Sequence, residues 1–283
     1  NNIAMGYVMR GKPILQVALD FIHLKRALQV LDEAVEGGVD WIEVGTPLIK
    51  SEGMDTIRTV KKRYPNHTVV ADLKTMDVGG AEVEMASKAG ADIIIIMGLA
   101  ENSTIEEAVK TSRRYGTKIM LDLMEVVDKA KRAKEAELMK VDYLCVHVSI
   151  DAQMIGKKPF QELKEVARVA KMPVAVAGGL NSETVAQALS AGASIIIVGG
   201  AIIKAPDVTS ATKRIKEAML KRRKIRTKLY KKYTEDEVYE AFMKVSTPNI
   251  ADAMHKKGVM KGIVPRINPV SYTHLRAHET GRN

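Results

Sequence analysis

The sequence contains very little cysteine and few aromatic residues. A single cysteine, Cys145, excludes an intrachain disulfide and is typical of a protein kept in a reducing cytoplasm, so we expect a cytoplasmic location. Aromatic residues make up only 4% of the 283 residues, although 46% are hydrophobic. The core must therefore be built from aliphatic side chains and methionine, which suits parallel strands buried beneath helices.

Long apolar runs are also missing. The longest run, at 93–97, is far shorter than the roughly 20 residues of a membrane-spanning helix, so we expect no membrane partner. Acidic residues are fewer than basic ones: 44 Lys and Arg against 34 Asp and Glu leave a net charge of +10. Residues 213–232 hold eleven basic residues and one acid, which accounts for this whole excess. Nucleic acid is therefore expected to bind, if at all, only through 213–232, and a solvated helical linker is the competing interpretation.

Short runs rich in β-branched residues recur at near-even intervals, separated by stretches with the apolar 3–4 spacing of helices. Eight strands are predicted, at 14–19, 41–44, 68–71, 93–97, 118–123, 143–148, 173–177 and 195–198. Gly38, Gly90 and Gly192 lie in similar junctions where a helix ends and a strand follows. This pattern predicts a (β/α)8 barrel over residues 1–212, of the α/β class. An open doubly wound sheet is the alternative, but no dinucleotide-binding glycine loop follows the first strand.

Charged side chains gather at the predicted carboxyl ends of these strands, where such barrels carry their active sites. They are Asp20 at the first strand, Glu43 at the second, Asp72, Lys74 and Asp77 at the third, Asp122 at the fifth and His147 at the sixth. An unpaired buried charge is costly. The ring of charges therefore predicts one shared site.

The residue types in this ring indicate their chemistry. Asp72 and Lys74 are two apart on a strand and are expected to share a face. Lys74, between Asp72 and Asp77, is expected to stay protonated and to stabilise an anion forming on a substrate. Glu43 and Asp72, on adjacent strands, are predicted to bind Mg²⁺, because two carboxylates leave room for the waters that this ion retains.

His147 is the predicted acid–base group, since it is the only histidine at a strand end and imidazole titrates near neutrality. Cys145, two residues earlier, is interpreted as a packed core thiol. Two glycine pairs follow the seventh and eighth strands, and their bare backbone N–H groups predict a phosphate site. These glycines are Gly178, Gly179, Gly199 and Gly200.

Together these residues resemble the orotidine monophosphate decarboxylase suprafamily, whose hallmark is DxKxxD at the end of the third strand. The resemblance spans residues 12–212 and rests on ALD, EVGTPL, ADLKTMD, HVSIDAQ, AGGL and VGGAI. The matching branch holds 3-hexulose-6-phosphate synthases and 3-keto-L-gulonate-6-phosphate decarboxylases. The resemblance implies a homodimer of barrels, Mg²⁺ on Glu43 and Asp72, and Asp77 reaching the neighbouring subunit's site.

Three positions separate the two activities of this branch. The decarboxylases tend to carry Glu, Arg and Thr where this chain has Asp122, Ile150 and Ala177, so the chain resembles the synthases. The aliphatic Ile150 in place of Arg leaves a small dry space that suits formaldehyde. The resemblance implies Mg²⁺-dependent aldol addition of formaldehyde to D-ribulose 5-phosphate, and decarboxylation is the alternative. Substrate-binding positions would be Asp20, Ile150, Ala177, Gly178, Gly179, Gly199 and Gly200.

The chain continues beyond the predicted barrel and linker. Residues 233–268 resemble the opening of the ribonuclease E activity regulator family, an RraA-like unit too short to include its sites. Residues 269–283 match neither unit and look like translated adapter sequence. An RNA-binding or ribonuclease-regulating protein, acting through 213–232 and this terminal unit, is the alternative of another class.

Overall fold

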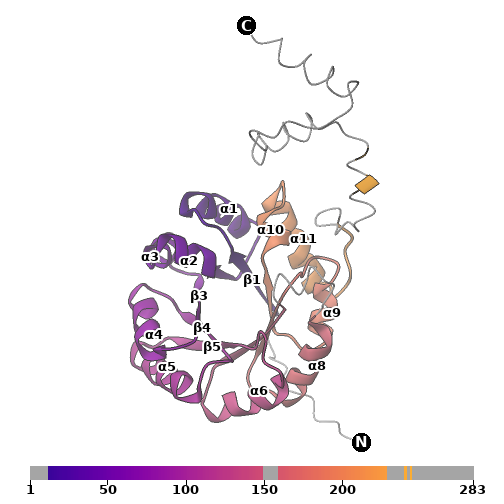
Figure 1. The fold of residues 1–283 in the computed structure, drawn as a ribbon. Coiled ribbons are helices and arrows are strands. Elements are labelled where there is room, and N and C mark those ends of the chain that lie inside the picture. The colour runs from indigo at the N-terminus through magenta and orange to yellow at the C-terminus, as the bar shows by residue number, and fades with distance from the viewer. Residues whose placement is uncertain (1–11, 149–158, 228–238, 241–242, 244–283) are drawn as a thin grey trace, which may run out of the picture. The chain divides into compact units, whose positions relative to one another are not determined.

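The computed structural model describes residues 12–148, 159–227, 239–240 and 243. Eight parallel strands close into a barrel with helices around it (Figure 1). In chain order the elements are β1 Ile14–Leu19, α1 Leu24–Glu36, β2 Trp41–Val44, α2 Thr46–Glu52, α3 Asp55–Arg63, β3 Thr68–Thr75, α4 Gly79–Lys88, β4 Ile93–Met97, α5 Asn102–Tyr115, β5 Lys118–Asp122, α6 Lys129–Leu138, β6 Tyr143–His147, α8 Phe160–Val169, β7 Val174–Ala177, α9 Val185–Ser190, β8 Ile195–Val198, α10 Gly200–Ile203 and α11 Val208–Leu220.

Each strand pairs in parallel with the next one, and β1 also pairs with β8, where Ile14 lies opposite Ile195 and Val17 opposite Val198. The predicted (β/α)8 barrel is therefore confirmed, and the open sheet is excluded. Because all strands run in one direction, their carboxyl ends meet at a single mouth of the barrel.

The glycines at the helix-to-strand junctions have the backbone that the sequence predicts. Gly38, Gly90 and Gly192 have φ angles of 94°, 99° and 108°. Residues with a β-carbon rarely adopt this left-handed region, and glycine adopts it freely. Each helix can thus stop abruptly and turn the chain into the next strand.

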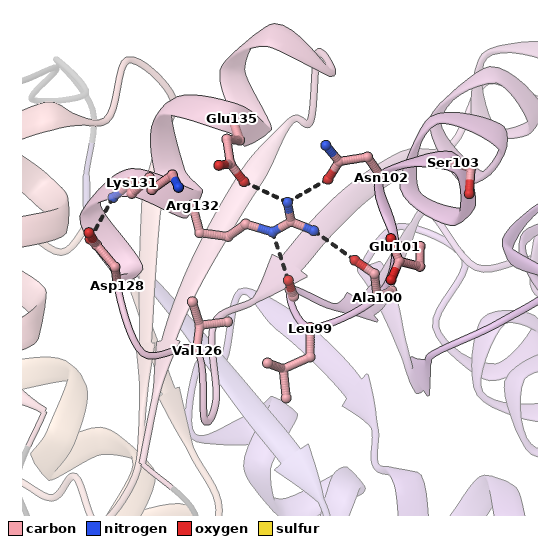
Figure 2. Close-up of a pocket in the computed structure, with 11 residues that line it drawn as sticks. Leu99, Ala100, Glu101, Asn102, Ser103, Val126, Asp128, Lys131, Arg132 and Glu135 are labelled. Carbon is pink, nitrogen blue, oxygen red and sulfur yellow. Dashed lines mark hydrogen bonds and ion pairs between the residues drawn. The ribbon is translucent and has the colours of Figure 1, made fainter.

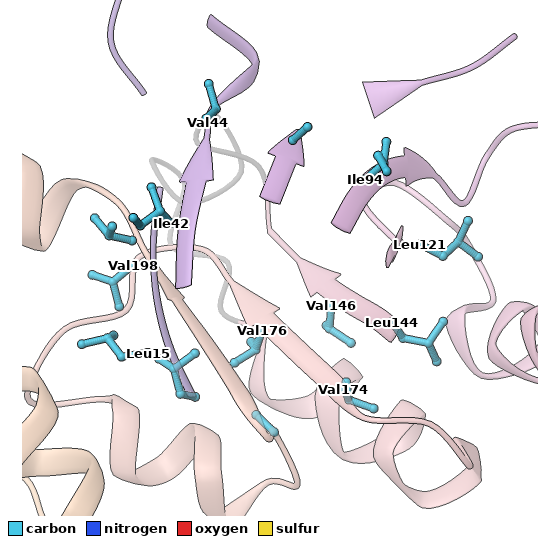
Figure 3. Packing of buried hydrophobic residues seen from close by; sticks show 14 of the residues in the cluster. Leu15, Ile42, Val44, Ile94, Leu121, Leu144, Val146, Val174, Val176 and Val198 are labelled. Carbon is cyan, nitrogen blue, oxygen red and sulfur yellow. The ribbon is translucent and has the colours of Figure 1, made fainter. Parts of the chain in front are cut away.

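Two apolar layers pack against the two faces of the barrel wall. Outward-facing strand residues such as Leu15, Ile42 and Leu144 contact the helices, and Figure 3 shows these side chains fanning away from the strands. Inward-facing residues form a second, smaller cluster that includes Met120 and Cys145. Cys145 is free and buried, so its interpretation as a core thiol is confirmed.

Strand β3 is longer than the sequence predicts and irregular at its end. It runs to Thr75, and its register against β4 shifts between Asp72 and Thr75. Lys74, inside this irregularity, has a φ of 48°. A local bulge of this kind re-aims side chains at the end of a strand. Simple alternation, which the sequence argument assumed for Asp72 and Lys74, therefore does not describe this segment.

The basic segment also differs from the prediction of a helical linker at 213–232. Helix α11 crosses residue 212 and ends at Leu220, and it buries Ile215 and Met219, so residues 213–220 belong to the barrel layer. Beyond it, Arg222 has a φ of 46°, and the chain folds back across the turn after β7. There the N–H of Ile225 donates to the carbonyl of Ser182, 3.0 Å away.

Parts of the sequence-based predictions fall outside the described residues. Residues 228–232, nearly all of the predicted RraA-like unit at 233–268, and the tail at 269–283 are among them, as is Ile150. No helix in the described part of the chain combines the length and apolar character needed to cross a membrane.

Candidate active site

Lys74 lies at the centre of the charges at the barrel mouth. Its Nζ is 3.0 Å from Asp72 Oδ2 and 3.2 Å from Asp122 Oδ2. Burial by itself lowers the pKa of Lys74, but the carboxylates of Asp72 and Asp122 outweigh this effect and raise the pKa above its usual range. This raised pKa favours the protonated form that the sequence predicts for Lys74.

The second carboxylate beside Lys74 is not the predicted one. Asp77 is exposed, and its Oδ1 accepts a hydrogen bond of 2.7 Å from the backbone N–H of Val78. The irregular end of β3, with Lys74 at a φ of 48°, carries the chain past the mouth before Asp77, and Val78 directly after it is also left-handed. Asp122, from β5, pairs with Lys74 in its place.

Asp122 joins Lys74 to His147. Its carboxylate, only 1% exposed, is 2.8 Å from His147 Nδ1 and accepts a 2.9 Å bond from the N–H of Met124. Burial raises the pKa of Asp122, but the hydrogen bond and charge of His147 and the charge of Lys74 outweigh it, so the pKa is lowered. An ionised carboxylate only accepts hydrogen bonds, so His147 Nδ1 donates to it, and in a neutral ring Nε2 is then the nitrogen that can accept a proton.

Glu43, Asp72 and Asp20 form an acidic cluster beside Lys74. Burial raises the pKa of Glu43 well above its usual range, and the charges of Asp72 and Asp20 raise it further. The surrounding protein and then Asp72 likewise raise the pKa of Asp20. Three carboxylates next to one ammonium leave excess negative charge, which a divalent cation on Glu43 and Asp72 would neutralise.

These residues therefore fit a divalent cation in charge and in ligand type. In the described part of the chain, however, no three His, Cys, Asp or Glu side chains converge as a complete metal-binding group. Two protein carboxylates with further oxygens from water or substrate are what Mg²⁺ commonly uses.

Three close contacts surround the acidic cluster. Thr46 Oγ1 is 2.8 Å from Asp72 Oδ2 and 2.9 Å from the Asp72 carbonyl, so it fixes that carboxylate. Gly45 lets the chain pass Asp20, because a β-carbon there would lie 2.4 Å from Asp20 Oδ1. Deep inside the barrel, Gln16 Nε2 donates to Glu43 Oε2 at 2.5 Å.

The predicted phosphate positions lie at the same mouth, after β7 and β8. Ala177 is the last residue of β7, and Gly178 and Gly179 have φ angles of 115° and 66°. A β-carbon on Gly178 would lie 2.8 Å from the carbonyl oxygen of Val148. The second pair follows β8, where Gly199 precedes α10 and Gly200 begins it.

A cavity of about 610 Å³ lies apart from these charges, between the loop after β4 and helix α6. Figure 2 shows Arg132 at its centre, where the guanidinium donates to the carbonyls of Gly98 and Ala100, both at 2.7 Å, and to Asn102 and Glu135. With its donors used within the protein, Arg132 joins helix α6 to the segment that follows β4. None of the charged strand-end residues lines this cavity.

Gln16 and Thr46 were missed from the sequence. Gln16 is an amide within the apolar run ILQVAL, at the position that alternates with Ala18 and Asp20, and this alternation was a usable signal. Thr46 follows directly on Glu43-Val44-Gly45, but nothing local indicates that its hydroxyl reaches Asp72 on another strand.

The chain is similar in sequence to proteins of a known family. Residues 13–215 match the Orotidine 5'-phosphate decarboxylase / HUMPS family. The 3-hexulose-6-phosphate synthase of Bacillus subtilis (strain 168) is 37% identical over 207 residues, which cover 73% of this chain and 98% of that protein. The match ends before residues 233–268, where the RraA-like unit was predicted.

Two solved structures extend this comparison. The 3-hexulose-6-phosphate synthase from Salmonella typhimurium superposes with a TM-score of 0.71 at 35% identity, covering 74% of this chain and 99% of that one. The 3-keto-L-gulonate-6-phosphate decarboxylase from Vibrio cholerae O1 superposes with a TM-score of 0.66 at 27% identity, covering 75% and 99%. The synthases are thus more similar to the chain than this decarboxylase is.

Proposed function

Because the chain belongs to the orotidine 5'-phosphate decarboxylase / HUMPS family, we propose that it is a lyase that joins formaldehyde to D-ribulose 5-phosphate. The product is D-arabino-3-hexulose 6-phosphate, and the same site catalyses the reverse cleavage. The observation that carries this proposal is the linked Lys74–Asp122–His147 arrangement at the mouth of a barrel that matches synthases at 35–37% identity. The alternative, 3-keto-L-gulonate-6-phosphate decarboxylation, is the activity named for a less similar structure.

His147 and Lys74 carry the proton and the charge in this reaction. Nε2 of His147 removes a proton from C1 of ribulose 5-phosphate, and the electron pair forms an enediolate whose negative oxygen the Lys74 ammonium stabilises. C1 then attacks formaldehyde, and the new alkoxide takes the proton back from His147. Mg²⁺ on Glu43 and Asp72 would add positive charge beside the sugar oxygens.

Asp122 keeps both groups in their reactive states. As an ionised acceptor it holds the proton on His147 Nδ1 and places Lys74 beside the histidine. Asp20, Ala177 and the glycine pairs 178–179 and 199–200 are proposed to bind the sugar phosphate. Left-handed glycines at the first pair support this role, since their backbone N–H groups can approach a phosphate closely.

The proposed reaction is tested by mixing the protein, Mg²⁺, ribulose 5-phosphate and formaldehyde. We expect formaldehyde to disappear as hexulose phosphate forms. Absence of formaldehyde loss would overturn the synthase assignment. If the protein instead released CO₂ from 3-keto-L-gulonate 6-phosphate faster than it consumed formaldehyde, the decarboxylase assignment would replace it. The Asp55→Asn variant serves as a control of protein quality, because Asp55 is exposed and pairs with Arg58 on its own helix.

A homodimer with shared sites is also proposed. Asp77 faces solvent between Met76 and Val78, which are 51% and 61% exposed, and Leu99 and Val127 on the next two loops are also exposed. Large apolar side chains around the mouth favour contact with a second copy of the chain. Asp77 would then enter the neighbouring subunit's site.

Subunit mixing tests this arrangement. Asp77→Ala and His147→Ala are each expected to be nearly inactive, whereas re-paired mixtures should regain activity, because one site of each heterodimer holds both intact residues. That site would give up to half the wild-type rate. No recovery in a mixture shown by sedimentation to contain dimers would exclude Asp77 from the partner's site.

An RNA-binding role through residues 213–232 remains the alternative of another class. Part of this segment's charge is already paired in the barrel unit, as in the Lys216–Asp40 and Lys224–Glu183 ion pairs. Weak, sequence-independent binding that disappears at high salt is therefore expected in a filter-binding titration. Sequence preference retained at high salt would support the regulator instead.

A further inference from the structure

Gln16 places an amide inside an otherwise apolar part of the barrel. It is 0% exposed and alternates on β1 with Ile14 and Ala18, both of which pack in the interior apolar cluster. Its Nε2 donates to Glu43 Oε2 at 2.5 Å. Its other polar atom, Oε1, is buried and has no hydrogen-bond partner among the described residues.

The buried, unpartnered oxygen of Gln16 lowers the stability of the folded state. A buried amide oxygen without a partner loses its hydration, and an apolar side chain of the same length would avoid that loss. The neighbouring interior positions on β1 are filled by apolar Ile14 and Ala18. Packing therefore does not explain why this position carries a glutamine, and a functional reason is needed.

We propose that Gln16 is a positioning residue that orients Glu43 to bind a divalent cation. The amide N–H holds one carboxylate oxygen of Glu43, which leaves the other oxygen to bind the ion. This inference rests on the proposed metal site at Glu43 and Asp72.

The position of Glu43 explains why such a group is needed. Glu43 is the second-last residue of β2 and is paired in register with Ala18 on one side and Val70 on the other, so the residues opposite it provide no side-chain donor. Asp72 is held differently, by the hydroxyl of Thr46. Each proposed metal ligand thus has one neutral side chain that fixes a carboxylate oxygen, as is usual for residues that ligate metals.

The test is a titration of metal-free protein with Mn²⁺, followed by electron paramagnetic resonance and without substrate. Gln16→Met replaces the amide with an apolar side chain of similar size, and Gln16→Asn keeps the amide but shortens its reach. Met120→Leu, at a buried interior position on β5 that is not a proposed metal ligand, is the matched control. We expect the Mn²⁺ dissociation constant to rise 10–100-fold in both Gln16 variants. In the control variant we expect it to stay unchanged.

Thermal unfolding without metal provides the second measurement. Gln16→Met removes the unpartnered amide oxygen but also the hydrogen bond to Glu43, so its Tm is expected to stay close to that of the wild type. Wild-type Mn²⁺ affinity in both Gln16 variants would overturn the positioning role and assign Gln16 a structural one. Failure of the wild type itself to bind Mn²⁺ would instead overturn the metal site on which the inference rests.

Discussion

Replacing Asp122 with asparagine tests the central arrangement of the site. The variant keeps the shape of the side chain and removes the charge that Lys74 Nζ meets at 3.2 Å and His147 Nδ1 at 2.8 Å. An asparagine amide can donate to Nδ1, which would move the histidine proton to Nε2. His147 could then no longer accept a proton from the substrate, so kcat should fall by the roughly 10²–10⁴ that a general base contributes.

The same change should destabilise the fold. A pair of unit charges 3.2 Å apart interacts by about 5 kcal/mol at an effective dielectric constant of 20. Lys74 is partly exposed and retains Asp72 at 3.0 Å, which reduces the net loss. Breaking one partner of a buried pair costs about 3–5 kcal/mol in general, so we expect about 2–4 kcal/mol here.

The loss of stability in Asp122→Asn should depend on pH in a direction set by the pKa of Asp122. The folded-state pKa of Asp122 is lowered, so its stabilising contribution is present above the unfolded-state pKa of about 3.9 and is lost as the pH falls through the folded value. The stability difference between wild type and Asp122→Asn should therefore be constant from about pH 5 to 7 and narrow below about pH 4.

Urea denaturation across this range, together with steady-state kinetics at pH 7, measures both effects. Asp55→Asn, an exposed carboxylate variant, should stay within about 0.5 kcal/mol of the wild type. A fall in kcat of less than about tenfold would refute the assignment of His147 as the base held by Asp122. An equal stability of both proteins at pH 7 would refute the charge argument.

Three further substitutions test the surroundings of the site. Gly45→Ala places a β-carbon 2.4 Å from Asp20 Oδ1, so it should cost about 1–3 kcal/mol in urea denaturation and lower activity, and normal activity would contradict the close approach. Ser182→Ala removes the hydroxyl that donates to the Ile225 carbonyl at 2.8 Å and should cost about 1–2 kcal/mol; equal protection of the 221–227 backbone in hydrogen exchange would contradict the docking of that segment. Ile94→Ala, at a fully buried site between barrel and helices, should cost about 2–5 kcal/mol in the same denaturation assay, and a cost below 1 kcal/mol would contradict its packing.

Local patterns in the sequence were enough for the architecture. Strand and helix periods, and the glycines that end helices at Gly38, Gly90 and Gly192, depend only on neighbouring residues, so the eight units could be counted without coordinates. Once the barrel was inferred, parallel strands required their carboxyl ends to meet. That requirement alone brought Asp72, Lys74, Asp122 and His147 to one mouth.

The pairings within that site were decided by the tertiary structure. Asp122 rather than Asp77 lies beside Lys74 because β3 shifts register and adopts a left-handed turn, and neither feature follows from a period of two. The contact between Gln16 and Glu43 depends on how far β1 and β2 are offset inside a closed barrel. Side-chain partners from different strands are set by register and by a few unusual backbone angles, and these arise from the packing of the whole barrel.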